Sequence, residues 1–151
     1  MTKALRSKII LFVGVFFSML SLQAQVTTNS GSGLAPTYAS LDAAIAALNA
    51  ATITSPVVIT LTAANPQTAP AGGYELRAEG TATNTIKIIG NGNTITASSS
   101  LTPGALNDGL FKVIGGDYIS IESFVLKEAA SNTIIDAGTN NMTEWGVAVL
   151  Y

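Results

Sequence analysis

From residue 56 onward the chain consists of short runs of β-branched residues, each bounded by Gly, Asn, Ser or Pro. Runs of roughly four to eight such residues between turn formers are typical of β-strands. Several strands at close spacing restrict the fold to a sandwich, a barrel or a stacked repeat structure. The predicted strands are Val57–Thr62, Tyr74–Arg77, Thr85–Ile89, Asn93–Thr96, Leu110–Ile114, Tyr118–Leu126, Thr133–Ile135 and Gly146–Tyr151.

A single helix is predicted before these strands. Ser40 is a favourable N-cap, and Asp42 lies in the first turn, where the positive end of the helix dipole favours an acid. The Ala-rich composition supports a helix through Asn49. Its apolar residues share one face, and they are Leu41, Ala44, Ile45 and Leu48.

A weak internal repeat favours the stacked structure. Ile86–Gly90 (IKIIG) recurs 25 residues later as Phe111–Gly115 (FKVIG), and Ile134–Gly138 is a fainter copy that begins 23 residues after Phe111. This period is the length of one coil in a stacked solenoid. We expect inward-facing aliphatic residues to lie in rows, with glycine at the corners. The alternative is a chance similarity between two β-rich segments of a sandwich.

The chain has no Cys and no His. It therefore has no disulfide, no thiolate or imidazole metal ligand and no imidazole base, which excludes Ser-His catalysis and His-ligated zinc. Only 11% of the residues are charged, and the formal net charge is −2. A nucleic-acid partner is excluded because binding to the phosphate backbone requires a basic face.

Residues 1–24 have the features of a secretory signal peptide. Three basic residues precede residues 9–22, which form an uncharged, mostly apolar run. That run is shorter than the roughly 20 residues that a membrane-spanning helix needs. A charged start, an apolar run and a small residue together predict cleavage after Ala24. We expect contact with a membrane only during export, and the alternative is an uncleaved N-terminal anchor.

Three segments are expected along the chain. The signal peptide covers residues 1–24, a polar Gly/Ser-rich linker covers 25–36, and the folded part covers 37–151. Removal of the signal peptide leaves four basic and nine acidic residues, so the mature net charge is 4 − 9 = −5. An acidic exported chain without Cys is typical of a bacterial envelope protein that is stabilised by packing.

The segment Leu110–Leu126 (LFKVIGGDYISIESFVL) resembles a rung of the right-handed parallel β-helix proteins of the pectin-lyase-like class, which occur as large secreted proteins in the Bacteroidota. Thr37–Leu61 is similar to their N-terminal cap, and Asn84–Ile88 to the rung between. The resemblance implies an all-β fold, the start of a right-handed parallel β-helix (solenoid) with an N-terminal amphipathic capping helix. It covers most of the mature chain and is specific for architecture, not for activity.

The chain stops within an apparent strand, and no polar capping segment follows Val147–Tyr151. Repeat proteins need caps at both ends. We therefore expect this chain to be the N-terminal part of a longer protein. The alternative is that its end pairs with another chain or a bound partner.

No catalytic residue is predicted, because the carboxylates do not form an adjacent pair and no Arg-x-Lys motif is present. Asp108 and Asp117 are interpreted first as turn residues that bond to nearby backbone amides. A weaker hypothesis is a Ca²⁺ site made by Asp108, Asp117 and Asp136, which lie in loops of the predicted successive coils. No other cofactor is expected.

Three aromatic residues are the candidate ligand-binding side chains: Tyr118, Trp145 and Tyr151. Aromatic faces pack against pyranose rings, so these residues form a candidate platform for a sugar. Tyr118 is equally compatible with a position that points into the core.

Together these features predict an exported cell-surface or secreted scaffold that is adhesin-like or glycan-binding and non-catalytic in this segment. Its predicted partner is a polysaccharide or a cell-surface glycan. The first alternative is the N-terminal part of a polysaccharide lyase or glycoside hydrolase whose active site lies beyond Tyr151. The second is a small stand-alone β domain in which the repeat is accidental.

Overall fold

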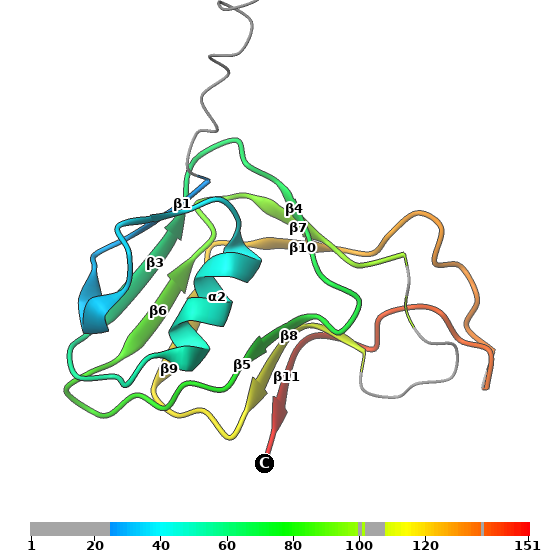
Figure 1. The fold of residues 1–151 in the computed structure, drawn as a ribbon. Helices are drawn as coiled ribbons and strands as arrows, with labels where there is room; N and C mark the ends of the chain where they lie inside the picture. The colour runs from blue at the N-terminus through cyan, green and yellow to red at the C-terminus, as the bar shows by residue number, and fades with distance from the viewer. Residues whose placement is uncertain (1–24, 100, 102–107, 137) are drawn as a thin grey trace, which may run out of the picture.

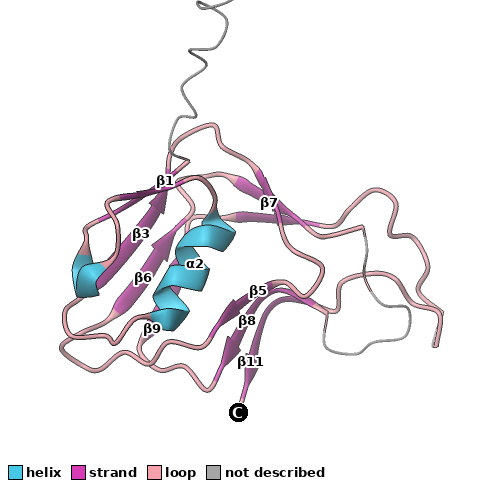
Figure 2. Ribbon diagram, viewed as in Figure 1, coloured by secondary structure: helices cyan, strands magenta, loops and turns pink. Residues whose placement is uncertain are grey.

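The computed structural model describes residues 25–99, 101, 108–136 and 138–151 (Figure 1). The predicted signal peptide, residues 1–24, lies outside the described residues. The described chain contains one α-helix, one short 3₁₀ turn and eleven strands (Figure 2). They are β1 (Val26–Thr28), η1 (Gly31–Gly33), β2 (Thr37–Tyr38), α2 (Leu41–Ala50), β3 (Val57–Leu61), β4 (Gln67–Thr68), β5 (Tyr74–Leu76), β6 (Ile86–Ile89), β7 (Thr94–Thr96), β8 (Gly109–Ile114), β9 (Ile119–Glu122), β10 (Val125–Lys127) and β11 (Trp145–Leu150).

The strands form three small sheets. The first has the order β2-β1-β3-β6-β9 and is mixed, because β1 pairs antiparallel with β2 and β3 whereas β3, β6 and β9 pair in parallel. The second sheet, β10-β7-β4, and the third, β11-β8-β5, contain parallel pairs. Strands that follow each other in the chain therefore usually belong to different sheets.

The prediction of an all-β right-handed parallel β-helix, a solenoid with coils of 23 to 25 residues, is wrong. The structure has mixed antiparallel and parallel pairing in three small sheets, with one helix. Ile86 and Phe111, which begin the two matched segments, do not lie over one another: Ile86 pairs with Ile119 in the first sheet, and Phe111 pairs with Tyr74 in the third. The two segments are alike because both are half-buried strands with the same alternation of side chains.

The predicted helix is confirmed by α2. The Ser40 hydroxyl accepts a hydrogen bond from the Ala43 N–H at 3.1 Å, which caps the first turn. The helix contacts β5 and β2, and Asn49 near its C-terminal end bonds the outer edge of β5. Its buried residues are the predicted ones, Leu41, Ala44, Ile45 and Leu48.

Two of the predicted strands differ from the observed ones. The run Tyr118–Leu126 is divided into β9 and β10, because Ser123 has a φ of 59° and this left-handed conformation ends the first strand. Residues 133–135, which the structure describes, form no strand. The N–H of Ile134 instead donates to the Asn141 side chain at 2.9 Å.

Residues 25–36 are predicted as an exposed linker, but in the structure they contribute β1 to the first sheet. Val26 pairs with Leu61 and is fully buried, and Leu34 is 5% exposed. A single valine among polar residues gives no strand pattern in the sequence. The strand forms because the edge of β3 offers unpaired backbone groups that an adjacent segment satisfies.

The core lies between α2 and the inner faces of the three sheets. Phe111 is fully buried at its centre, with ring centroids 5.2 Å from both Tyr74 and Phe124. The core is shared by all three sheets, which fixes the positions of their outer strands.

Among the described residues, no helix has the length and apolar character needed to cross a bilayer.

Candidate functional site

Large hydrophobic side chains are exposed in one part of the described chain, from residue 118 to residue 151. This part contains β9, β10 and β11, which are the terminal strands of the three sheets. Exposed apolar surface that is contiguous often marks an interaction site, so this part of the chain is the candidate. The exposed residues are Tyr118, Val125, Leu126, Ile134, Ile135, Trp145, Val147, Val149 and Tyr151.

All three aromatic residues of the predicted sugar platform are exposed. Trp145 is the first residue of β11 and is 54% exposed, and Tyr151 directly follows this strand and is fully exposed. The six steps between them span about 20 Å, at roughly 3.3 Å for each residue of a strand. One chain therefore does not bring Trp145 and Tyr151 together into a single platform.

Tyr118 lies on the side of Tyr151. It is 56% exposed and precedes β9 with a φ of 55°, so the side chain does not enter the core. The Gly115 N–H, in the turn that leads to Tyr118, donates to the Leu150 carbonyl at 2.9 Å. Tyr118 and Tyr151 thus flank the same turn, whereas Trp145 lies at the other end of β11.

The structure does not bring the three predicted Ca²⁺ ligands together. Asp108 directly precedes β8 and Asp117 follows its other end, so the length of that strand separates them. Asp136 lies in a turn in which its carbonyl accepts from the Thr139 N–H. The described residues contain no group of three acidic side chains placed to hold a metal ion. The Ca²⁺ site stays a prediction that this geometry does not support.

Asp108 instead faces Glu144. The Asp108 N–H donates to Glu144 Oε2 at 3.2 Å, and the Glu144 N–H donates to the Asp108 carbonyl at 3.0 Å. Burial raises the pKa of Asp108, and the charges of Glu144 and Glu128 raise it further against the opposing effect of Lys112. The proximity of Asp108 to Glu128 and Glu144 was not predicted, because both glutamates lie far from Asp108 in the chain.

Glu128 has a structural role in the same region. Its Oε2 accepts from the Thr143 N–H at 2.7 Å and its Oε1 accepts from the Asn132 side chain at 2.7 Å. Partial burial raises the pKa of Glu128, but these hydrogen bonds, with one from Ala129, hold the pKa below its ordinary value. The ionised carboxylate therefore holds the segment before β11 in place.

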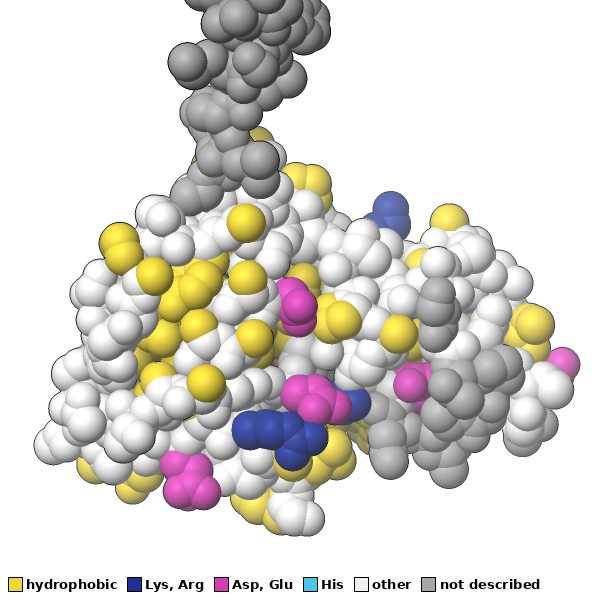
Figure 3. Space-filling view, in the orientation of Figure 1, with side chains coloured by type: hydrophobic (Ala, Val, Ile, Leu, Met, Phe, Trp, Pro, Cys, Tyr) yellow, Lys and Arg dark blue, Asp and Glu magenta, His cyan; other side chains and the backbone are white. Residues whose placement is uncertain are grey.

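An open pocket of about 300 Å³ lies between α2 and the segment that leads into β5. Its walls include Asp42, Ile45, Asn49, Pro70 and Glu75. Figure 3 shows that acidic and basic side chains are sparse on this face and gather near the helix. The pocket was not predicted, because α2 and β5 give no joint signal in the sequence.

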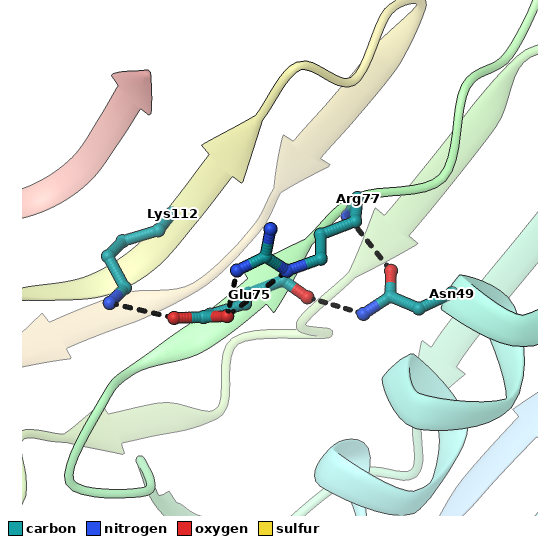
Figure 4. Close-up of polar contacts among 4 residues, drawn as sticks. All are labelled: Asn49, Glu75, Arg77 and Lys112. Atoms are coloured by element: carbon teal, nitrogen blue, oxygen red, sulfur yellow. Dashed lines mark hydrogen bonds and ion pairs between the residues drawn. The ribbon is translucent and has the colours of Figure 1, made fainter. Parts of the chain in front are cut away.

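The polar groups beside this pocket are bonded to one another (Figure 4). Glu75 Oε2 lies 2.7 Å from Arg77 Nη2, and Glu75 Oε1 lies 3.0 Å from Lys112 Nζ. Hydrogen bonds from Arg77 and then Lys112 hold the pKa of Glu75 below its usual range. Glu75 is therefore ionised and paired, which suits a structural role better than that of a general base.

Asn49 links α2 to the backbone at the edge of β5. Its Nδ2 donates to the Glu75 carbonyl at 2.7 Å, and its Oδ1 accepts from the Arg77 N–H at 2.9 Å (Figure 4). One carboxamide thus pairs with a strand edge as a neighbouring strand does.

Tyr74 forms the buried side of this region. Burial and then the charge of Asp42 raise the pKa of Tyr74 to about 12. Its hydroxyl donates to the Thr68 carbonyl at 3.3 Å, so it stays protonated and binds the chain internally.

No protein-family model, no curated protein and no solved structure matches this chain. The resemblance to the pectin-lyase-like class therefore stays a prediction from the residues alone.

Proposed function

We propose that this protein is an exported surface or secreted protein that binds a glycan, in the manner of an adhesin, and that its described part is not catalytic. The observation that carries the proposal is the concentration of exposed apolar side chains, three of them aromatic, in residues 118–151. Aromatic rings present an apolar face to a ligand and lose little conformational entropy on binding. They are thus suited to the apolar faces of pyranose rings.

Four of the nine carboxylates are engaged in contacts within the fold. Glu75 is paired with Arg77 and Lys112, and Glu122 Oε1 lies 2.9 Å from Lys87 Nζ. Glu128 and Glu144 accept hydrogen bonds from backbone N–H groups. Acid-base hydrolysis of a glycosidic bond requires two carboxyl groups that face a shared substrate, and the contacts of these four glutamates favour a structural role for them.

Export is proposed from residues 1–24. The test is to express the gene in a Gram-negative host and to sequence the N-terminus of the extracellular protein. A mature chain that begins at Gln25 is expected. Recovery of the protein only from the cytoplasm, with Met1 retained, would refute the export proposal.

Glycan binding is tested on an array of plant, algal and bacterial polysaccharides. Tyr118→Ala, Trp145→Ala and Tyr151→Ala are each expected to weaken binding several-fold, because each removes one ring. The matched control is Ile135→Ala, which removes an aliphatic side chain that is 76% exposed. Binding that survives all three aromatic substitutions would refute the platform, and release of unsaturated or reducing sugars would favour the lyase or hydrolase alternative.

A further inference from the structure

The pocket of about 300 Å³ lies between two elements whose relative position is fixed. The helix α2 forms one wall, and residues that lead into β5 form the other. The Asn49 carboxamide bonds the backbone of Glu75 and Arg77 at 2.7 and 2.9 Å, and so holds the two walls together (Figure 4). The volume is at the lower end of the range for small-molecule sites. The pocket is therefore preformed and suits a ligand of about one ring in size.

Gly72 keeps the pocket open beside Glu75. A Cβ atom built on Gly72 would lie 4.0 Å from Glu75 Oε1, and apart from its chain neighbours it would meet no other atom within that distance. The backbone of Gly72 is not left-handed, so its conformation does not require glycine. The missing side chain leaves space that a ligand can occupy.

Asp42 is the unpaired charge of the pocket. Within the described part of the chain, its carboxylate takes part in no hydrogen bond and no ion pair. Burial and then the charge of Asp42 raise the pKa of Tyr74, the first residue of β5, so this carboxylate lies near the strand that forms the opposite wall. Its lone pairs are free to accept hydrogen bonds from a ligand.

Glu75 is the second carboxylate of the pocket, and its charge is balanced by Arg77 and Lys112. Oε2 accepts two hydrogen bonds from Arg77, and Oε1 is bonded to Lys112. A carboxylate offers about four lone-pair sites, so Oε1 keeps one, on the oxygen nearest to the space at Gly72. Glu75 is thus suited to a neutral hydroxyl group, whereas Asp42 is suited to a cation.

The remaining walls are mostly apolar. Ile45, Ala46 and Pro70 contribute carbon atoms to the lining. Proline has no N–H group, and the Pro70 carbonyl already accepts from the Gly73 N–H at 2.8 Å. The charged atoms of the lining are all hydrogen-bond acceptors. The pocket therefore matches a ligand that combines an ammonium group and hydroxyl groups with an apolar ring face.

We propose that this pocket binds one protonated amino-sugar unit. The ammonium group donates to Asp42, a ring hydroxyl donates to Glu75 Oε1, and the apolar face of the ring contacts Ala46 and Pro70. A hydrogen bond between charged groups is about twice as strong as one between neutral groups. The choice of a sugar rests on the proposed function, but the site is separate from the aromatic residues of 118–151.

Titration of the protein with D-glucosamine at pH 6, where the amine is protonated, tests the site by NMR. The backbone amides of Gly72 and Gly73 and the side-chain amide of Asn49 are expected to shift with a single dissociation constant, because all three residues line the pocket. Absence of any shift at about 50 mM glucosamine, well above the millimolar range of weak binding, would overturn the proposal.

Two neutral sugars test the role of the ammonium group. N-Acetyl-D-glucosamine keeps the ring but loses the charge, and D-glucose has a hydroxyl group in place of the amine and adds no bulk. Each is expected to have a dissociation constant at least about tenfold higher than that of glucosamine, because the contact with Asp42 loses its charge assistance. Equal affinity for glucose and glucosamine would overturn the ammonium site.

Asp42→Asn tests the same contact from the side of the protein. The variant keeps the shape of the side chain, and it is expected to raise the dissociation constant of glucosamine about tenfold and to abolish its preference over glucose. Glu79→Gln is the matched control, because it removes the charge of an exposed acid outside the pocket. Equal losses in the two variants would show a response to net charge alone and would overturn the site.

Gly72→Leu tests the space independently of charge. Its side chain would extend from a Cβ beside Glu75 Oε1 into the pocket, so glucosamine binding is expected to be lost while the melting temperature stays near that of the wild type. Unchanged affinity in the folded variant would overturn the location of the site. Asp42→Asn decides the question if Gly72→Leu does not fold.

The aromatic variants separate this site from the platform of the proposed function. Tyr118→Ala, Trp145→Ala and Tyr151→Ala change residues outside the pocket and are expected to leave the affinity for glucosamine unchanged. Loss of glucosamine binding in these variants, but not in Asp42→Asn, would overturn the pocket and support the platform. Glucosamine binding that depends on Asp42 supports the pocket even if the polysaccharide array shows no role for the aromatic residues.

Discussion

Replacement of Asn49 by Ala is expected to destabilise the fold, although the residue lies near the end of a helix where Ala is favourable. The substitution removes two hydrogen bonds, from Asn49 Nδ2 to the Glu75 carbonyl at 2.7 Å and from the Arg77 N–H to Asn49 Oδ1 at 2.9 Å. Each is worth about 1 kcal/mol. The better helix propensity of Ala returns about 0.6 kcal/mol. The expected net loss is about 1.5 kcal/mol.

For a chain of this length that loss lowers the melting temperature by about 3–6 °C. Circular dichroism at pH 7 measures it. Asn84→Ala is the matched control, because the Asn84 side chain takes part in no hydrogen bond within the described part of the chain, and it is expected to change the melting temperature little.

Hydrogen exchange provides a local readout of the same substitution. The Arg77 amide is bonded to the Asn49 side chain, so its exchange is expected to accelerate in Asn49→Ala and not in Asn84→Ala. An Arg77 amide that keeps its protection, or a melting temperature equal to that of the control, would show that this contact does not hold α2 to β5.

Three further substitutions test the core and the charge clusters. Phe111→Ala leaves a cavity beside the Tyr74 and Phe124 rings and is expected to cost about 3–5 kcal/mol in urea unfolding; a loss below about 1 kcal/mol would contradict the central position of this ring. The ion pairs hold the folded-state pKa of Glu75 below its ordinary value of 4.5, so their stabilisation is present at pH 7 and lost as the pH falls below 4.5 through the folded-state pKa. Glu75→Gln is therefore expected to flatten the pH dependence of stability on the acid side, and an unchanged profile would argue against these pairs. For Asp108 the pH dependence of stability has the opposite sign. Its folded-state pKa is raised above the ordinary value of 3.8, so the folded protein is favoured below that pH. This stabilisation is lost as the pH rises through the folded-state pKa. Asp108→Asn is thus expected to raise the melting temperature at pH 7 and to have a smaller effect at pH 3, and equal effects at both pH values would contradict repulsion from Glu144.

Local elements of this fold were predictable from the sequence. The N-cap at Ser40 and the spacing of Leu41, Ala44, Ile45 and Leu48 located α2, because these signals act within one or two turns. Buried strands such as β3 and β8 were predicted from their β-branched residues for the same reason. Trp145 and Tyr151, two of the candidate ligand-binding residues, are exposed.

The assignment of strands to sheets was not predictable. Ile86 and Phe111 begin segments with the same local pattern, yet they belong to the first and third sheets. The turns decide this placement, as at Ser123, where one left-handed residue divides β9 from β10. Neither the sheet to which a strand belongs nor the turn that precedes it changes the alternation of side chains along that strand.

The sequence by itself determined where the helix and most strands form and which side chains of each are apolar, because these properties depend on neighbouring residues. Only the tertiary structure decided that Asn49 bonds the edge of β5, that Glu144 meets Asp108 and that β11 ends a sheet. Such contacts join segments that are distant in the chain. They form because each sheet edge and each buried polar group takes the partner that the packing of the core brings within reach.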